Sequence, residues 1–105
     1  MITDLWVETN GVSLKINFYA TFRPIVGAKT IEVPFSEGLT LRQLVDQVIE
    51  SYPALERQLM DDQGVLFGYV HVFINGRDHY YLPAGLDTVL SERDEIDIFP
   101  PVGGG

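Results

Sequence analysis

The chain has 105 residues, of which 46% are hydrophobic and 21% charged, a composition typical of one soluble domain with a single core. Fifteen acidic residues against seven basic ones give a net charge of −8, which disfavours nucleic-acid binding through a basic patch. The absence of cysteine excludes disulfides, cysteine-ligated metal sites and cysteine nucleophiles. With no signal-peptide pattern and no apolar run of about 20 residues, we expect a cytoplasmic protein without a membrane segment.

The first third of the chain predicts a two-stranded hairpin after an N-terminal extension. Residues 1–12 show no clear period and end near an Asn-Gly turn signal, so we interpret them as the extension. Apolar side chains then occupy every second position of a predicted strand: Leu14, Ile16 and Phe18. Pro24 and Gly27 mark an expected loop, and a second strand is predicted over residues 29–35.

One long helix is predicted to begin after Thr40. Thr40 is the expected N-cap, and Gln43 stands where it completes a capping box. Apolar residues then recur at spacings of three and four: Leu41, Leu44, Val45, Val48, Ile49 and Tyr52. Pro53 is expected to end the helix, because the residue before a proline is pushed out of the helical region. A face this wide is expected to pack on a sheet.

The second half of the chain predicts short strands separated by turns. Residues 55–68 are less regular, and Asn75-Gly76 is a hairpin signal. Residues 85–94 are interpreted as a loop with at most one helical turn. The three strands are expected at residues 69–74, 80–82 and 95–99.

The order of these elements predicts the fold class. Strand, strand, helix, strand, strand, strand is an α+β pattern in which one main helix covers a mixed sheet of four to five strands. By analogy at the level of the fold, this order fits the ubiquitin-like β-grasp, in which the first and last strands lie side by side at the sheet centre. We assign residues 13–105 to this domain.

Two prolines and a glycine run follow the last predicted strand directly. Glycines add nothing to a core, but they form a chain slim enough to enter a narrow channel. We therefore interpret the carboxylate of Gly105 as the reacting group, and Gly103 and Gly104 as the residues that allow threading. The residues assigned to presenting this flexible tail, residues 100–105, are Pro100, Pro101 and Val102. The alternative is that the proline pair simply ends a strand.

Strand alternation also predicts a docking surface. If Leu14 and its alternate neighbours face the helix, three aromatic side chains lie together on the opposite face: Tyr19, Phe73 and Phe99. Clustered exposed aromatic residues usually mark an interface with a partner. The alternative is that the extension, with Leu5 and Trp6, folds over them.

Other polar residues carry weaker indications. His71 and His79 lack the carboxylate spacing of a metal site and are expected on the surface, so no metal is predicted. Four acids are expected to form a solvated rim beside the tail: Glu92, Asp94, Glu95 and Asp97. Arg23 and Arg42 are expected to pair with neighbouring acids.

Several segments of residues 13–105 resemble the MoaD/ThiS sulfur-carrier family. They are Phe18-Tyr19-Ala20, Phe22-Arg23, Gly27, Leu39-Thr40-Leu41-Arg42-Gln43-Leu44, Ile74-Asn75-Gly76-Arg77, Gly85-Leu86-Asp87-Thr88 and the block from Asp94 to Gly105. The final block is the specific one, because a strand ending in Phe-Pro-Pro-Val-x-Gly-Gly is unusual outside this family. The chain departs from the family in its extension, in a longer segment after the helix, and in Gly103, where alanine, serine or threonine is more usual.

The resemblance, closest to the small subunit of molybdopterin synthase, implies a sulfur carrier without bound cofactor or catalytic machinery of its own. It implies that a partner enzyme uses ATP to adenylate Gly105, and that a sulfur-donor system converts the adenylate to a thiocarboxylate. The large subunit of molybdopterin synthase, or an equivalent acceptor, would then receive the sulfur. Three alternatives stay open: a ubiquitin-like protein modifier, a carrier for thiamine synthesis or transfer-RNA thiolation, and a β-grasp interaction domain with an inert tail.

Overall fold

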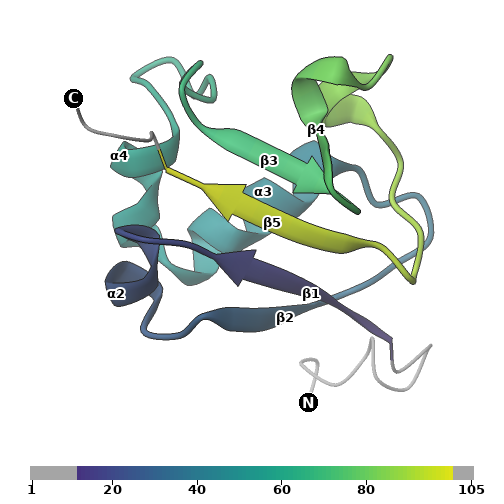
Figure 1. Ribbon diagram of the computed structural model, residues 1–105, viewed down its shortest axis with the longest axis horizontal. Coiled ribbons are helices and arrows are strands. Elements are labelled where there is room, and N and C mark those ends of the chain that lie inside the picture. Colours follow the sequence, from purple (N-terminus) through teal and green to yellow (C-terminus); the bar gives the residue numbers. More distant parts are fainter. Residues whose placement is uncertain (1–11, 101–105) are drawn as a thin grey trace.

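The first and last strands lie side by side at the centre of a five-stranded sheet (Figure 1). The structure is a computed structural model that describes residues 12–100. Its strands are β1 (Ser13–Phe18), β2 (Thr30–Pro34), β3 (His71–Ile74), β4 (Arg77–Asp78) and β5 (Glu95–Phe99). β1 pairs in parallel with β5, the other pairs are antiparallel, and the order is β2-β1-β5-β3-β4. The predicted β-grasp arrangement is confirmed.

The main helix, α3 (Leu41–Ser51), begins and ends where the sequence predicts. The Thr40 hydroxyl accepts a hydrogen bond from the Gln43 backbone N–H at 3.2 Å, and the Gln43 side-chain oxygen accepts one from the Thr40 N–H at 3.0 Å. Four residues of α3 are buried against the sheet: Leu41, Leu44, Val45 and Val48. Within residues 12–100, no helix is both long and apolar enough to cross a membrane.

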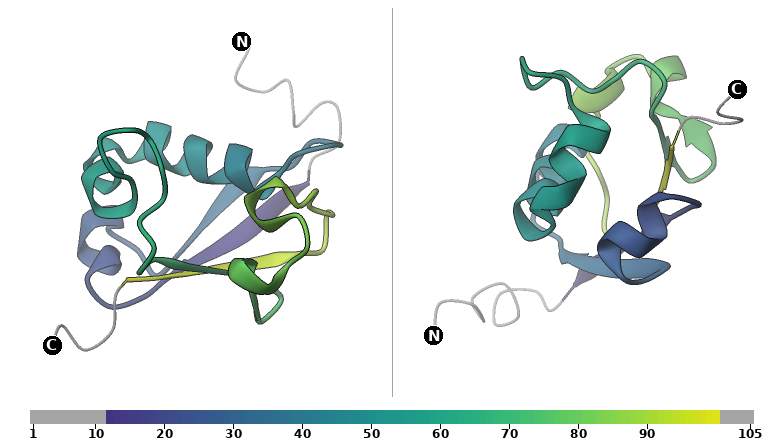
Figure 2. Two further views of the ribbon diagram at one scale, coloured as in Figure 1. Left: turned by 90° about the horizontal axis from the view of Figure 1, so that it is seen from above. Right: turned by 90° about the vertical axis from the view of Figure 1, so that its left-hand side faces the viewer.

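Strand alternation separates a buried face of the sheet from an open one. Leu14, Ile16 and Phe18 of β1 are almost completely buried, and so are alternate residues of β3 and β5. Burial of each large aliphatic side chain contributes about 1.5–3 kcal/mol, so this face holds the sheet on the helices. The side views show α3 and α4 on one side of the sheet (Figure 2). We call the opposite side the open face.

Two short helices occur where the sequence analysis expected irregular chain. α2 (Phe22–Val26) replaces the predicted loop after β1, and α4 (Glu56–Leu59) follows a single turn, η2 (Pro53–Leu55). Pro24 is tolerated because it lies in the first turn of α2, where the backbone N–H groups have no partner within the helix. Gly27 ends α2 with a φ of +84°. The residues that these segments bury are Phe22, Leu55 and Leu59.

The prediction of a strand over residues 80–82 is wrong. Asn75 and Gly76 have φ values of +52° and +85°, as a tight hairpin turn requires, so the chain returns at once as β4. The Asp78 side chain then accepts a hydrogen bond from the Tyr80 N–H and begins a helical turn, η3 (His79–Tyr81). A second turn, η4 (Gly85–Asp87), lies in the expected loop.

Removing the capping hydroxyl of Thr40 should lower stability. Thr40→Ala removes the acceptor of the Gln43 N–H, and we expect the free energy of unfolding in urea to fall by about 1 kcal/mol. Thr21→Ala is the matched control, because Thr21 is the N-cap of α2 but its side chain makes no capping hydrogen bond. An equal loss in both variants would show that the capping bond is not responsible.

Candidate functional site

The three predicted aromatic side chains meet at one end of the open face. The rings of Tyr19 and Phe99 are stacked, with centroids 4.1 Å apart and planes 7° apart. Phe73 approaches Phe99 edge-on, with centroids 5.2 Å apart. All three are half-buried. We call Tyr19, Phe73 and Phe99 the aromatic cluster. It lies at the carboxyl ends of β1 and β5, which the parallel pairing brings to the same edge of the sheet.

The predicted tail begins at this cluster. Pro100, the last described residue, follows Phe99 directly and is buried. The chain is therefore held on the sheet up to Pro100. The other tail residues lie outside the described residues: Pro101, Val102, Gly103, Gly104 and Gly105. Leu5 and Trp6 of the predicted extension also lie outside them, so the alternative cover for the aromatic cluster stays a hypothesis.

A chain of polar side chains connects the aromatic cluster to the neighbouring strands. The Tyr19 hydroxyl donates a hydrogen bond to Asp97 Oδ1 at 2.8 Å, and Asn17 Nδ2 donates to the same oxygen at 2.9 Å. Asn17 also donates to Glu95 Oε2 at 2.7 Å and accepts from the Thr30 hydroxyl at 2.8 Å. The hydrogen bond to Asp97, followed by burial, raises the pKa of Tyr19 above its usual 10.0, so the hydroxyl stays protonated at neutral pH.

Arg23 supports the ring of Tyr19, and among residues 12–100 it forms no ion pair with an acid, contrary to the prediction. Its guanidinium carbon lies 5.3 Å from the centroid of the Tyr19 ring, within the range of a cation–π contact. Its Nε donates to the Phe18 carbonyl at 2.8 Å. Arg42 does form the predicted ion pair, with Asp87 at 3.0 Å, but both side chains are exposed and the pair contributes little.

The acidic rim is largely at the other end of β5. Glu92, Asp94 and Glu95 stand at or before the start of the strand, whereas the tail leaves from its end. The Asp94 carboxylate is engaged in a hydrogen bond close by in the sequence, which it accepts from the Ser91 N–H at 2.8 Å. Only Asp97 lies near the aromatic cluster. The prediction of a rim beside the tail is therefore wrong for three of its four residues.

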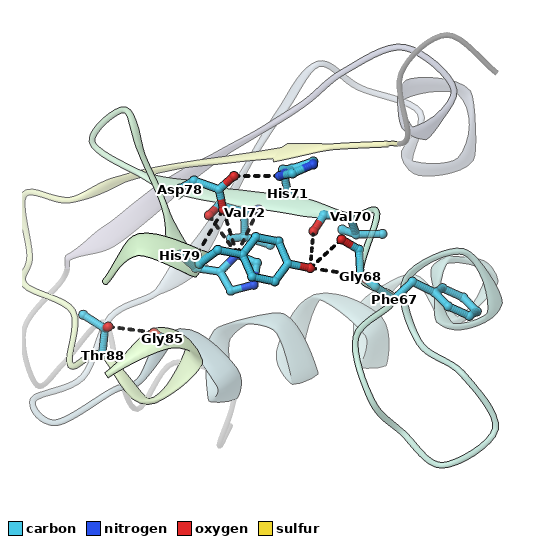
Figure 3. A network of polar contacts seen from close by, with 10 residues as sticks. Phe67, Gly68, Val70, His71, Val72, Asp78, His79, Gly85 and Thr88 are labelled. Carbon is cyan, nitrogen blue, oxygen red and sulfur yellow. Dashed lines mark hydrogen bonds and ion pairs between the residues drawn. The ribbon is translucent and has the colours of Figure 1, made fainter. Parts of the chain in front are cut away.

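His79 is buried, which contradicts its predicted surface position. Figure 3 shows Asp78 between the two histidines, with His71 Nδ1 at 2.6 Å and His79 Nδ1 at 3.4 Å from its carboxylate oxygens. His79 is 5% exposed and its Nδ1 lies 3.3 Å from the Val72 carbonyl oxygen. Burial lowers the pKa of His79, while the Val72 carbonyl and Asp78 oppose this effect. His71 is half-exposed, as expected.

Asp78 is the residue of the sequence that signals this burial. Asp78 follows the Asn-Gly turn closely and begins η3, which turns the next side chain, His79, under the sheet. The Tyr80 hydroxyl then donates to the Gly68 carbonyl at 2.7 Å and fixes η3 against the segment before β3. Among residues 12–100 no three histidine or acidic side chains are arranged to hold a metal ion.

Comparison with known proteins links this arrangement to one family. The model of the ThiS family matches residues 16–105. Small archaeal modifier protein 3 of Haloferax volcanii is 34% identical over 94 residues, which cover 90% of this chain and 100% of the relative. The molybdopterin synthase sulfur carrier subunit of Arabidopsis thaliana is 24% identical over 98 residues, which cover 93% of this chain and 88% of the relative. The crystal structure of SAMP1 from Haloferax volcanii has a TM-score of 0.78 at 29% identity, covering 89% of this chain and 99% of SAMP1.

The buried ring of His79 should make stability depend on pH. Its pKa is lowered below the usual 6.5, so the unfolded state binds more protons in the interval between the two values. The contribution of the neutral His79 ring to the free energy of unfolding is therefore fully present above about pH 6.5 and is lost as the pH falls below that value. We expect the free energy of unfolding in urea to decrease from about pH 8 to about pH 5 more steeply in the wild type than in His79→Gln.

His71→Gln is the control for this measurement, because it leaves the buried ring of His79 in place. The free energy of unfolding of His71→Gln should still decrease with falling pH through the titration of His79, whereas in His79→Gln this part of the decrease should be absent. A wild type and a His79→Gln variant with the same slope would contradict the assignment.

Proposed function

The chain belongs to the ThiS family, and from this premise we propose that it is a sulfur carrier whose sulfur is held as a thiocarboxylate on Gly105. Its relatives include proteins named as sulfur carriers and as small modifiers. The observation that carries the proposal is where β5 ends in the sheet, because the tail follows β5 in the sequence. The family match runs through Gly105, and the tail follows a central strand whose last ring is packed into the aromatic cluster.

The chemistry at Gly105 needs an activating partner, because a carboxylate at neutral pH is a poor electrophile. A partner enzyme joins the carboxylate to the AMP portion of ATP and releases pyrophosphate. A hydrosulfide ion from a donor system then attacks the acyl carbon, AMP leaves with the electron pair of the broken bond, and the S–H proton is lost to solvent. The product is a thiocarboxylate, which passes its sulfur to an acceptor molecule while water supplies the oxygen that restores the carboxylate. The chain contributes position, since a threaded tail makes the reaction effectively intramolecular.

The aromatic cluster is the proposed docking surface for these partners. It stands where the tail leaves the sheet, so a partner that covers it receives the tail at its own active site. Asp97 borders the cluster, and the chain carries a net charge of −8, which favours a partner with a basic surface. The activating enzyme and the sulfur acceptor both need the same tail, so we propose that they bind this face in turn.

The acceptor that we propose is the precursor of molybdopterin, bound to a molybdopterin synthase large subunit. The similarity to the Arabidopsis thaliana molybdopterin synthase sulfur carrier subunit supports this choice. Sulfur delivery to thiamine or to transfer RNA would use the same thiocarboxylate with a different acceptor, so the docking partner alone distinguishes these pathways.

A second candidate function is protein modification. It is favoured by the 34% identity with small archaeal modifier protein 3 and by the similarity to the SAMP1 structure. In this case a lysine amine attacks the adenylate in place of sulfur, AMP leaves, and Gly105 becomes joined to the target through an amide bond. Activation of Gly105 by ATP is common to both functions. An interaction domain with an inert tail would not be activated.

Deleting Gly105 should abolish activation. We expect the full chain to support ATP–pyrophosphate exchange by its cognate activating enzyme, and the Gly105 deletion to support none, because the new terminus falls short of the site. Gly103→Ala is the matched control and should stay active, since alanine is usual there in the family that the chain resembles. All three proteins should unfold at the same urea concentration, because β5 ends at Phe99.

Exchange that persists without Gly105 would contradict the proposal. Normal synthesis of molybdopterin and of thiolated RNA in cells that carry the Gly105 deletion would also contradict it.

Removing the Phe73 ring should weaken docking. An aromatic residue at an interface centre often carries 2 kcal/mol or more, so we expect Phe73→Ala to weaken binding to the activating enzyme by about 10- to 100-fold in calorimetry. The control is Tyr81→Ala, which removes an aromatic ring that is 81% exposed on η3 and outside the cluster. Unchanged affinity in a folded Phe73→Ala protein, or an equal loss in both variants, would contradict the assigned surface.

A further inference from the structure

Tyr19 contacts β5 at two separate points. Its ring is stacked on Phe99, and its hydroxyl donates to Asp97, two residues earlier on the same face of the strand. A side chain with one contact could pivot about it, whereas two contacts fix its orientation relative to the strand. Because Phe99 immediately precedes Pro100, these contacts hold the last segment of β5 against β1.

The groups that hold Tyr19 are themselves held from other strands. Asp97 Oδ1 also accepts from Asn17, whose own side-chain oxygen accepts from Thr30 on β2. On the ring, Arg23 supplies a cation–π contact while its Nε is bound to the Phe18 carbonyl. The position of Tyr19 is therefore fixed by β1, β2, α2 and β5 together. Simple packing of an aromatic ring would not require a hydrogen-bonded chain across three strands.

We propose that Tyr19 is a positioning residue that sets the direction in which the chain leaves β5 after Phe99. The effect on the reaction of Gly105 rests on the proposed function, whereas the effect on the orientation of the chain at Phe99 does not. The hydroxyl of Tyr19 is the group that fixes the orientation. Without it, the Tyr19 ring would still cover Phe99, but the two stacked rings could rotate together. No step of the chemistry is assigned to Tyr19, which lies at the root of the tail.

The direction at Phe99 matters because it decides from where the flexible tail enters a partner's channel. Proline fixes φ at about −65°, so Pro100 and Pro101 limit how far the chain can turn before the glycines begin. Misplacement by about 1 Å can reduce the rate of a positioned reaction by about 100-fold. Loss of the hydroxyl should therefore slow the reaction of Gly105 with ATP after docking, and it should leave docking itself unchanged.

The test uses Tyr19→Phe, which removes the hydroxyl and keeps the ring. In ATP–pyrophosphate exchange we expect kcat to fall by about tenfold while KM for the chain stays within about twofold. The matched control is Tyr69→Phe, which removes a hydroxyl from an exposed tyrosine whose ring is stacked on Phe67. It should behave as the wild type. A rise in KM without a change in kcat would overturn the proposal, because it would show that the Tyr19 hydroxyl, and not only the ring in the aromatic cluster, takes part in docking.

A second measurement tests the direction of the tail without any partner. The sequence has no cysteine, so Gly103→Cys provides a single site for a nitroxide label. We expect the label to broaden a narrow set of amide signals in the Tyr19 protein and a wider set in the Tyr19→Phe protein. Identical sets would overturn the inference. A wild-type chain that no activating enzyme accepts would instead contradict the proposed function, and the relaxation result would still decide the role of Tyr19.

Discussion

The parallel pairing of β1 with β5 determines where the aromatic cluster and the start of the tail lie. It joins the first described strand to the last one at the sheet centre, with Phe18 opposite Ile98 in register. Parallel strands end at the same edge, so the residue after β1, Tyr19, stands beside Phe99. Without this pairing the tail would leave from a strand end with no aromatic cluster beside it. α3 makes the pairing possible, because it forms part of the long connection between the two halves of the sheet and buries their inner face.

The two faces of the sheet have different tasks. The inner face consists of apolar side chains whose burial stabilises the fold, and it leaves no polar side-chain atom buried without a partner within the described residues. The open face carries charged residues at the start of β5 and aromatic ones at its end. The polarity of the open face therefore decreases along β5 toward the tail. The polar chain from Thr30 to Asp97 runs from the edge strand β2 through Asn17 of β1 to β5, the strand that the tail follows.

Features encoded by neighbouring residues could be predicted from the sequence, and features that depend on distant packing could not. The Thr40 capping box, the alternation in β1 and the Asn75 turn are local signals, and each appears where it was expected. α2 was missed because Pro24 was interpreted as a loop signal, although the first turn of a helix tolerates it. His79 was misplaced because its burial depends on Asp78 and on the segment before β3. The aromatic cluster could be predicted because alternation and strand order together decide which side chains meet.

The intact mass of the protein isolated from its own cells shows whether Gly105 becomes a sulfur-bearing terminus. We expect a fraction of the chain to be heavier by the exchange of one oxygen for one sulfur, with the change located in the C-terminal peptide. Alkylation of the thiocarboxylate should increase the mass of that fraction further, by the mass of the added alkyl group. A chain found only with an unmodified terminus, or only joined through Gly105 to lysines of other proteins, would contradict the sulfur-carrier proposal.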